Sequence, residues 1–432
     1  MTAQRQSRVR LGEAWRRPAL SLFVVFTIVL LLLSETVRVE GGAEAAPYQA
    51  ASQTLPERVQ ETLDSMRARY GFPGATAAYA FTDGRSGTAA TGWADLEAEQ
   101  PMTPDSRMLA ASIGKTFVAA TAVALAEEGT LDLDAPIGRF LGERPWFDEL
   151  PNREAITLQH LLTHRSGLPD HVHLEAFAEA VSRRWREPGN PFPPDTLVQF
   201  VAGRPALFAP GEGWAYSDTG YILVGLILEE ATGEDYYDLV QKRFLTPLGL
   251  THTRPSNRRI LSGLAAGYAS ENPFGWPEKT LNADGAMAWH PGMEWTGGGL
   301  VSTSGDLARW GAALFGGAAL PEPALDQMLS AQPVAPAQPD VRYGMGVAVY
   351  QAGPFGPVYG HGGWIPGYVS SLRYYADHGV AIAFQINTDA GLETDTTSVV
   401  QEAESRLAEV VLSAENQADK RTQTTVQEAD GG

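Results

Sequence analysis

The first part of the chain alternates between helix-like and strand-like patterns of apolar residues. Over residues 55–70 apolar positions recur at helical spacing with charged residues between them, which predicts an amphipathic surface helix. The next two runs, residues 75–81 and 87–93, flank the turn sequence Asp83-Gly84. Such an arrangement predicts a β-hairpin.

An Ala-rich apolar run between Met108 and Gly129 predicts a buried helix. Glycine is the residue type that best accepts a left-handed cap after the last helical turn, so Gly129 marks its end. Ser112 then lies at the helix N-terminus, and Lys115 follows one turn later on the same face. This spacing brings an ammonium group beside a hydroxyl.

Helical patterns dominate the middle of the chain, and β-rich runs return near its end. The predicted middle helices cover residues 158–162, 197–201, 219–232 and 236–244. The predicted later strands cover residues 346–350, 358–361, 368–375 and 380–387, and a closing helix is predicted over residues 393–412. This order predicts an α/β (α+β) fold: an antiparallel β-sheet flanked by helices, with an inserted, mainly helical lobe.

The predicted boundaries follow from this order. One α/β lobe is expected from about residues 48–130 and 296–413, and the helical lobe from about residues 131–295. Residues 414–432 are polar, and this composition predicts a disordered tail. The helix that carries Ser112 would lie between the lobes, where small-molecule sites commonly occur.

Composition excludes several classes of function. A chain of 432 residues with 44% hydrophobic residues can bury a large core. Its formal net charge of −19 argues against a nucleic-acid partner, because no basic stripe is available to neutralise phosphates. Cysteine is absent, which excludes disulfides, cysteine catalysis and thiolate metal sites.

The N-terminus has the order of an export signal. Several arginines precede a nearly unbroken apolar run over residues 20–33, and Ala43-Glu44-Ala45 offers a small-x-small cleavage site. Residues 1–47 are therefore predicted to be a signal peptide or an N-terminal membrane anchor. The catalytic part is expected in the periplasm or outside the cell.

Two distant segments could assist Ser112. A serine hydroxyl needs a group that takes its proton, and Lys115 must be assisted if it is to do so. The segment Tyr216-Ser217-Asp218 could bring a phenol whose pKa is lowered by the Lys115 charge. Asp218 also has a purely structural interpretation, as the N-cap of a helix that begins at Thr219.

The third segment lies among the late β-runs. Residues 360–368 combine glycines with His361, so a substrate backbone could approach a strand edge beside a polar side chain. The alternative is a hairpin whose glycines only turn the chain. That alternative would not need His361.

With these three motifs in view, the chain resembles the penicillin-recognising serine hydrolases over roughly residues 72–387. The branch is that of class C β-lactamases, D-alanyl-D-alanine carboxypeptidases, D-aminopeptidases and related esterases. Supporting phrases are GWADLEAEQPMTPDSRM, LLTHRSGLP, FAPGEGWAYSDTGY and GGGLVSTSGDLARW. Together they are far more specific than any single motif.

The resemblance implies a role for each matching residue. Ser112 would attack a carbonyl carbon and form an acyl-enzyme, while Lys115 and Tyr216 would share the proton transfers. His361, Gly362 and Gly363 stand where the family has its third motif. The backbone N–H groups of Ser112 and Trp364 would hold the oxyanion.

Two departures from the family pattern bear on mechanism and substrate. Asp218 stands where an asparagine is usual, and we expect it to pair with Lys115 and keep the lysine charged, leaving Tyr216 as the main base. Gly362 offers no hydroxyl for a substrate carboxylate, and His361 is expected to be neutral. We therefore expect weak β-lactam turnover and a preference for esters or for peptides without a nearby free carboxylate.

The resulting prediction is an exported serine hydrolase that acts on a small molecule or peptide, such as a cell-wall peptide or an ester, without a cofactor. One alternative is a D-alanyl-D-alanine carboxypeptidase or a β-lactamase proper. A second is a penicillin-binding sensor or scaffold with slow or no turnover. No metal is expected: His160 and His164 lack the glutamate of a zinc-protease motif, and Asp170-His171-Val172-His173 is interpreted as a solvated loop.

Overall fold

The computed structural model describes residues 53–184, 189–270, 274–389 and 399–414. The predicted leader lies outside these ranges, as do all but the first residue of the predicted tail and the first part of the predicted closing helix. Within the described ranges, no helix is both long enough and apolar enough to cross a membrane.

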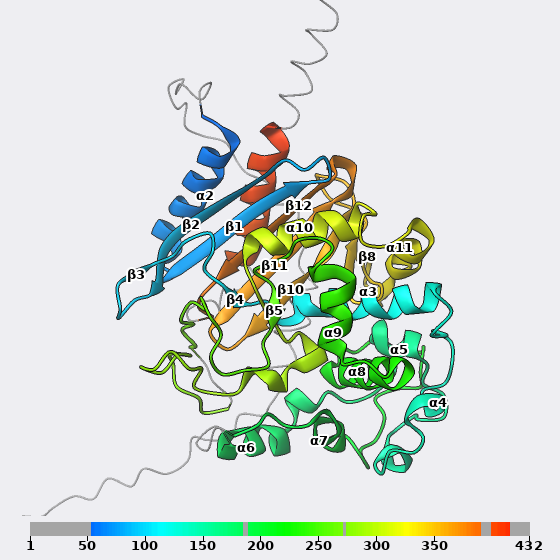
Figure 1. The fold of residues 1–432 in the computed structure, drawn as a ribbon. Coiled ribbons are helices and arrows are strands. Elements are labelled where there is room, and N and C mark those ends of the chain that lie inside the picture. The colour runs from blue at the N-terminus through cyan, green and yellow to red at the C-terminus, as the bar shows by residue number, and fades with distance from the viewer. Residues whose placement is uncertain (1–52, 185–188, 271–273, 390–398, 415–432) are drawn as a thin grey trace, which may run out of the picture.

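A nine-stranded antiparallel sheet forms the centre of the fold (Figure 1). In sheet order its strands are β3 (Gln100–Pro101), β2 (Ser86–Asp95), β1 (Gly74–Phe81), β12 (Val380–Ile386), β11 (Tyr368–Tyr375), β10 (Val358–Ile365), β9 (Ala348–Tyr350), β8 (Gln338–Tyr343) and β7 (Gln332–Ala335). The predicted hairpin is β1 with β2, and β1 pairs with β12 from the other end of the chain. The expected antiparallel sheet is thus confirmed.

One face of the sheet is covered by the first and last described helices. These are α2 (Leu55–Tyr70) and the helix over residues 399–414. Val59, Leu63 and Met66 of α2 are buried in one apolar cluster with side chains of the last helix and of the sheet. The helical spacing of apolar residues therefore identified this contact face correctly.

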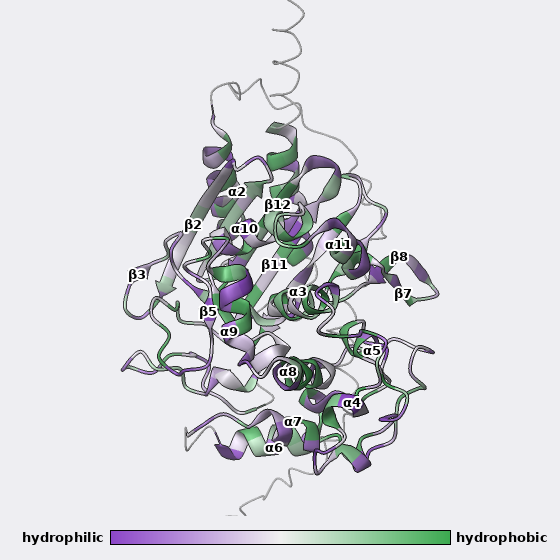
Figure 2. Cartoon of the chain, turned by 45° about the vertical axis from the view of Figure 1, so that its right-hand side comes forward, coloured by the Kyte–Doolittle hydropathy of each residue, from purple (hydrophilic) through white to green (hydrophobic). Residues whose placement is uncertain are grey.

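Helices on the opposite face connect the sheet to the helical region. α10 (Ser304–Phe315) packs on β1, β11 and β12, and α3 (Gly114–Glu127) contacts α8 (Asp218–Thr232) and α11 (Glu322–Leu329). Figure 1 shows α3 between the sheet and the helices below it. Figure 2 shows hydrophobic residues concentrated in α8, whose residues from Thr219 to Leu228 are all buried.

The remaining regular elements are short. They are α4 (Gly138–Leu141), α5 (Leu158–Leu162), α6 (Glu175–Arg184), α7 (Pro194–Gln199), α9 (Tyr236–Val240) and a small sheet of β4 (Met108–Leu109), β6 (Leu300–Ser302) and β5 (Arg254–Pro255). The small sheet places the chain just before Ser112 beside the segment that precedes α10. It thereby holds the start of the Ser112 turn.

Some element boundaries differ from the predicted ones. The strand predicted over residues 358–361 continues to Ile365 as β10, because its glycines extend a strand instead of turning the chain. The helix predicted over residues 236–244 is regular only to Val240 and then forms a π-helical turn. α7 begins at Pro194, earlier than expected, because proline fits the first turn of a helix.

Candidate active site

Ser112 lies in a tight turn that is held from two sides. The turn is a 3₁₀ helix over Ala111–Ile113 that leads directly into α3, and Ser112 is only 4% exposed. Ala111 has a positive φ of 48°, a backbone conformation that L-residues rarely adopt. Gly298 lies against it: an added Cβ there would be 2.4 Å from the Ala111 carbonyl oxygen. Close glycine packing thus supports the turn that presents Ser112.

Gly363 of β10 supports the same turn from the sheet side. A Cβ at this position would lie 2.3 Å from the carbonyl oxygen of Ala110 and 2.2 Å from the hydroxyl oxygen of Ser370. The Ser370 hydroxyl itself donates to the Ala110 carbonyl oxygen over 2.9 Å. Only glycine fits here without moving the backbone that precedes Ser112.

Gly363→Ala is therefore expected to lower the free energy of unfolding by about 1–3 kcal/mol and to reduce activity, because overpacking displaces the Ser112 turn. Chemical denaturation and esterase assays would measure both effects. Gly305→Ala is the control, because a Cβ added there would lie at ordinary contact distance, 3.4 Å, from its nearest neighbour, Thr88 Cγ2. Unchanged stability and activity in the Gly363 variant would contradict the packing argument.

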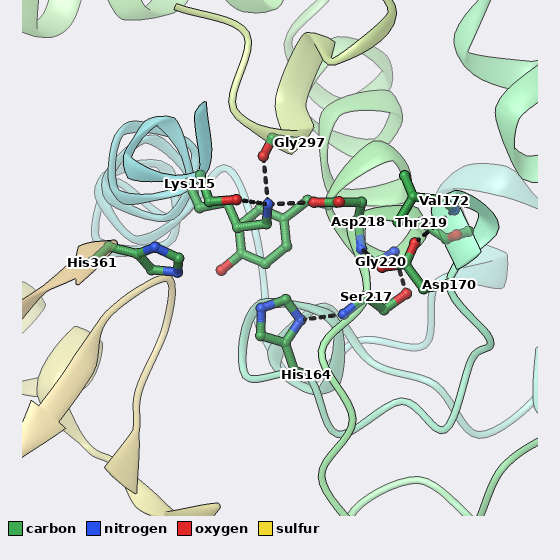
Figure 3. A network of polar contacts seen from close by, with 12 residues as sticks. Lys115, His164, Asp170, Val172, Ser217, Asp218, Thr219, Gly220, Gly297 and His361 are labelled. Atoms are coloured by element: carbon green, nitrogen blue, oxygen red, sulfur yellow. Dashed lines mark hydrogen bonds and ion pairs between the residues drawn. The ribbon is translucent and has the colours of Figure 1, made fainter. Parts of the chain in front are cut away.

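Lys115 is fully buried and has an acceptor for each of its three protons (Figure 3). Its Nζ donates to Ser112 Oγ over 3.3 Å and makes shorter hydrogen bonds to Asp218 Oδ1 and the Gly297 carbonyl oxygen. Three acceptors match the three N–H groups of a charged ammonium. The expected ion pair between Lys115 and Asp218 is therefore present.

Asp218 is the first residue of α8 and is not its N-cap. Ser217 caps the helix, with its hydroxyl oxygen accepting from the Gly220 N–H over 3.2 Å. The structural interpretation of Asp218 as the N-cap is therefore wrong. The serine satisfies the helix end, which leaves the Asp218 carboxylate available to Lys115.

Tyr216 lies beside both Lys115 and Ser112. Its ring centroid is 4.8 Å from Lys115 Nζ. The expected lowering of its pKa is wrong: burial, and then the negative charge of Asp218, raise the pKa of the phenol well above its usual range. A hydrogen bond with Ser112 lowers the pKa, but by less than burial raises it. Tyr216 is thus a neutral phenol at physiological pH.

His361 is buried in a chain of hydrogen bonds and not paired with an acid. Its Nε2 lies 2.9 Å from the Tyr343 hydroxyl oxygen, which also lies 3.2 Å from His164 Nε2. The Nδ1 of His361 lies 2.5 Å from the Gly362 carbonyl oxygen. Burial, reinforced by the Lys115 charge, lowers the pKa of His361 to about 3. This agrees with the expectation of a neutral imidazole.

Beyond Gly360, β10 pairs with a described strand along only one of its two edges. β9 pairs with β10 only from Val358 to Gly360, whereas β11 pairs along the full strand and places Val369 opposite Trp364. The Trp364 side chain packs against the apolar cluster that α2 forms with the sheet and the last described helix. In the described part of the chain, no further strand covers the β10 edge between His361 and Ile365.

Several residues near the Lys115 pair were not among the predicted site residues. Gly297 accepts a hydrogen bond from Lys115, and His164 Nδ1 accepts from the Ser217 N–H over 3.1 Å. Burial raises the pKa of Glu294 to about 8, and its Oε2 has no hydrogen-bond partner among the described residues. The glycine run and the histidine in LLTH were visible signals, but nothing in the sequence pointed to Glu294 as part of this network.

The histidines weighed as metal ligands have other partners. His160 Nδ1 lies 3.1 Å from the Thr157 hydroxyl oxygen, and His171 Nδ1 lies 2.9 Å from that of Thr219. Asp170 and His171 are buried, so the interpretation of this segment as a solvated loop is wrong. Within the described residues, no group of three or more His, Asp or Glu side chains could hold a metal ion.

The sequence profile described as Beta-lactamase matches residues 59–404, most of the chain. The chain belongs to the beta-lactamase family. This confirms the resemblance to penicillin-recognising serine hydrolases.

Two curated relatives within this family match at different lengths. Penicillin-binding protein 4* of Bacillus subtilis (strain 168) is 28% identical over 310 residues, which are 70% of this chain and 65% of that protein. Esterase EstB of Burkholderia gladioli is 36% identical over 165 residues, which are 37% of this chain and 41% of the esterase. The chain thus spans less than two thirds of the length of either protein.

Two solved structures of the family share the fold over most of the chain. D-amino acid amidase from Ochrobactrum anthropi SV3, in complex with L-phenylalanine amide, has a TM-score of 0.70 and 27% identity and covers 84% of this chain and 99% of its own. D-stereospecific amidohydrolase from Streptomyces sp. has a TM-score of 0.68 and 28% identity, and the match covers 80% of this chain and 97% of the amidohydrolase. Both agree with the mixed helix and antiparallel-sheet fold.

Proposed function

We propose that the protein is an exported serine hydrolase that cleaves an ester or amide bond through an acyl-enzyme on Ser112. The observation that carries the proposal is the contact of Lys115 Nζ with Ser112 Oγ at 3.3 Å while Lys115 is paired with Asp218. A nucleophile, a proton carrier and a proton acceptor thus lie in one line of contacts. Family relatives named as an esterase, an amidase and an amidohydrolase support the reaction class.

The proton route follows from the charges in the site. Because Lys115 is an ammonium and Tyr216 is a neutral phenol, neither is a ready base by itself. As Ser112 Oγ bonds to the substrate carbonyl carbon, its proton passes to Lys115 Nζ while a Lys115 proton passes to Asp218 Oδ1. Lys115 keeps its charge, Asp218 becomes neutral, and the substrate oxygen becomes the oxyanion.

The leaving group then takes back a proton by the reverse path. Collapse of the oxyanion breaks the ester or amide bond and returns the proton from Asp218 through Lys115 to the departing oxygen or nitrogen. Tyr216, whose ring lies 4.8 Å from Lys115 Nζ, shares this transfer. Water repeats the sequence on the acyl-enzyme and releases the acid.

The oxyanion is assigned to the backbone N–H groups of Ser112 and Trp364. The position of Gly363 against Ala110 supports this assignment, because it brings β10 to the Ser112 turn. Beyond Gly360, no described strand pairs with β10 on its β9 side, so this edge also offers backbone groups to a substrate. Each such donor typically supplies about 3–4 kcal/mol of transition-state stabilisation, or roughly 10²–10³ in rate.

The proposed substrate lacks a carboxylate near the scissile bond. His361 is neutral and Gly362 has no hydroxyl, while the Lys115 charge is already paired with Asp218. We expect kcat/KM for a p-nitrophenyl ester to exceed that for penicillin G by about 100-fold or more, the scale of two lost charge-assisted contacts. Parallel assays with both substrates would measure this ratio, and efficient penicillin hydrolysis would contradict it.

The experiment that tests the reaction class is active-site labelling. Incubation with a fluorophosphonate, followed by peptide mass spectrometry, is expected to place one adduct on Ser112. An adduct elsewhere, or none, would refute the acyl-enzyme.

Export is a separate part of the proposal and rests on the order of residues 1–47, in which a basic segment precedes an apolar one. Fractionation of producing cells tests it, and a purely cytoplasmic protein would contradict it.

A further inference from the structure

Asp170 lies buried behind the Lys115 pair (Figure 3). Its side chain is only 3% exposed and comes from the loop before the 3₁₀ turn His171–His173. Its Oδ2 accepts from the Asp218 N–H over 3.0 Å, and its Oδ1 accepts from the Val172 N–H over 3.3 Å. A buried carboxylate therefore contacts the backbone of the residue that pairs with Lys115.

Helix capping alone does not explain this contact. Ser217 already caps α8 through the Gly220 N–H. Asp170 instead binds the N–H of Asp218, in the first turn of α8, where a negative charge is favourable. A continuous line of contacts thus runs from Asp170 through Asp218 and Lys115 to Ser112.

We infer that Asp170 is a positioning residue that holds Asp218 in place to receive the Ser112 proton through Lys115. The inference rests on the proposed function. Two carboxylates this close repel each other, so uptake of a proton by either relieves the repulsion. Asp170 thus fixes the Asp218 backbone and also favours the neutral acid that the transfer creates.

Other charged or titratable groups around Asp170 come from three elements. His171 Nδ1 lies 3.6 Å from Oδ1, and His173 Nε2 lies 4.0 Å from Oδ2. Burial lowers the pKa of His171 to about 4, so this imidazole is neutral near pH 7. Asp218 comes from α8, and Lys115 of α3 lies beyond it.

These surroundings predict how the rate depends on pH. Burial, and then the charge of Asp218, raise the pKa of Asp170 to about 6. Lowering the pH through about 6 protonates Asp170 and removes its charge, so the wild-type rate falls on the acid side. Stability changes in the opposite direction. Because the pKa of Asp170 is higher in the folded state than in the unfolded chain, the free energy of unfolding falls as the pH rises from about 4 to about 6.

The test compares Asp170→Asn and Asp170→Ala with the wild type between pH 5 and 8, using a p-nitrophenyl ester. Asp170→Asn keeps an acceptor for the Asp218 N–H but has no charge. We expect its kcat to fall on the order of tenfold at pH 8, with KM unchanged. The fall in rate that the wild type shows as the pH drops through about 6, its acid limb, should be lost. Asp170→Ala should lose more, because it also removes the acceptor.

Asp306→Asn is the matched control. Asp306 is buried in α10 and accepts from the His252 N–H over 2.8 Å, which is the same kind of carboxylate-to-backbone contact. Its removal should lower the melting temperature but leave the shape of the pH profile intact. Melting curves of all variants separate loss of folding from loss of rate.

The outcomes distinguish this inference from the proposed function. Ser112-dependent turnover in the wild type, with a wild-type pH limb retained in Asp170→Asn, would overturn the positioning role alone. Failure of both Asp170 variants to fold would also overturn it, in favour of a structural role. Absence of Ser112-dependent turnover in the wild type would overturn both assignments.

Discussion

Ser112→Ala is expected to reduce kcat/KM for ester hydrolysis by on the order of 10⁴-fold or more, because the variant has no atom that can accept the acyl group. Binding should survive, since the side chain is small and its removal leaves the Lys115 pair intact. The measurement is steady-state hydrolysis of a p-nitrophenyl ester together with labelling by a fluorophosphonate and a fluorescent penicillin. Label on the alanine variant would disprove the assignment of the nucleophile.

A matched control is Ser65→Ala, at an exposed position of α2 on the other face of the sheet. It should label and hydrolyse like the wild type. The time course of the wild-type label separates the alternatives. A persistent label from both reagents would favour a penicillin-binding sensor, whereas rapid loss of the penicillin alone would favour a β-lactamase.

Asp218→Asn should lower kcat by roughly 10²–10⁴-fold, the usual contribution of a general acid–base group. The amide cannot accept the proton that Lys115 passes on, and it leaves a buried ammonium without its carboxylate. The dependence of the rate on pH should also change, because Lys115 loses its ion-pair partner. Profiles of kcat and kcat/KM between pH 5 and 10 would measure the change.

The control for this substitution is Asp64→Asn, at an exposed position of α2. It changes the net charge by the same amount at a distance from Ser112. Retention of the wild-type pH profile in Asp218→Asn would show that Asp218 takes no part in the proton route. Tyr216, which lies beside Lys115, would then be the remaining candidate acceptor.

The sequence predicted best those elements whose own residues carry a full helical or strand pattern. The spacing of apolar residues predicted α2 with its observed bounds, and β-branched and aromatic residues predicted β11 with its observed bounds. β7 and β8 were not predicted, because each begins with Gln-Pro and the apolar residues that follow are too few to form a strand pattern. β10 was predicted too short for a related reason: glycines that normally end a strand instead allow close packing here.

The sequence alone was enough to identify the family and the antiparallel sheet with its helical layers, because motif order and hydrophobic periodicity can be read directly from it. It also predicted the set Ser112, Lys115, Tyr216 and His361. The arrangement of charge around Ser112, in contrast, depends on how distant segments pack. The cap at Ser217, the burial that raises the pKa of Tyr216 and the contact of Asp170 with Asp218 depend on segments far apart in the chain. Burial and charge proximity are properties of the packed molecule, so no local pattern could reveal them.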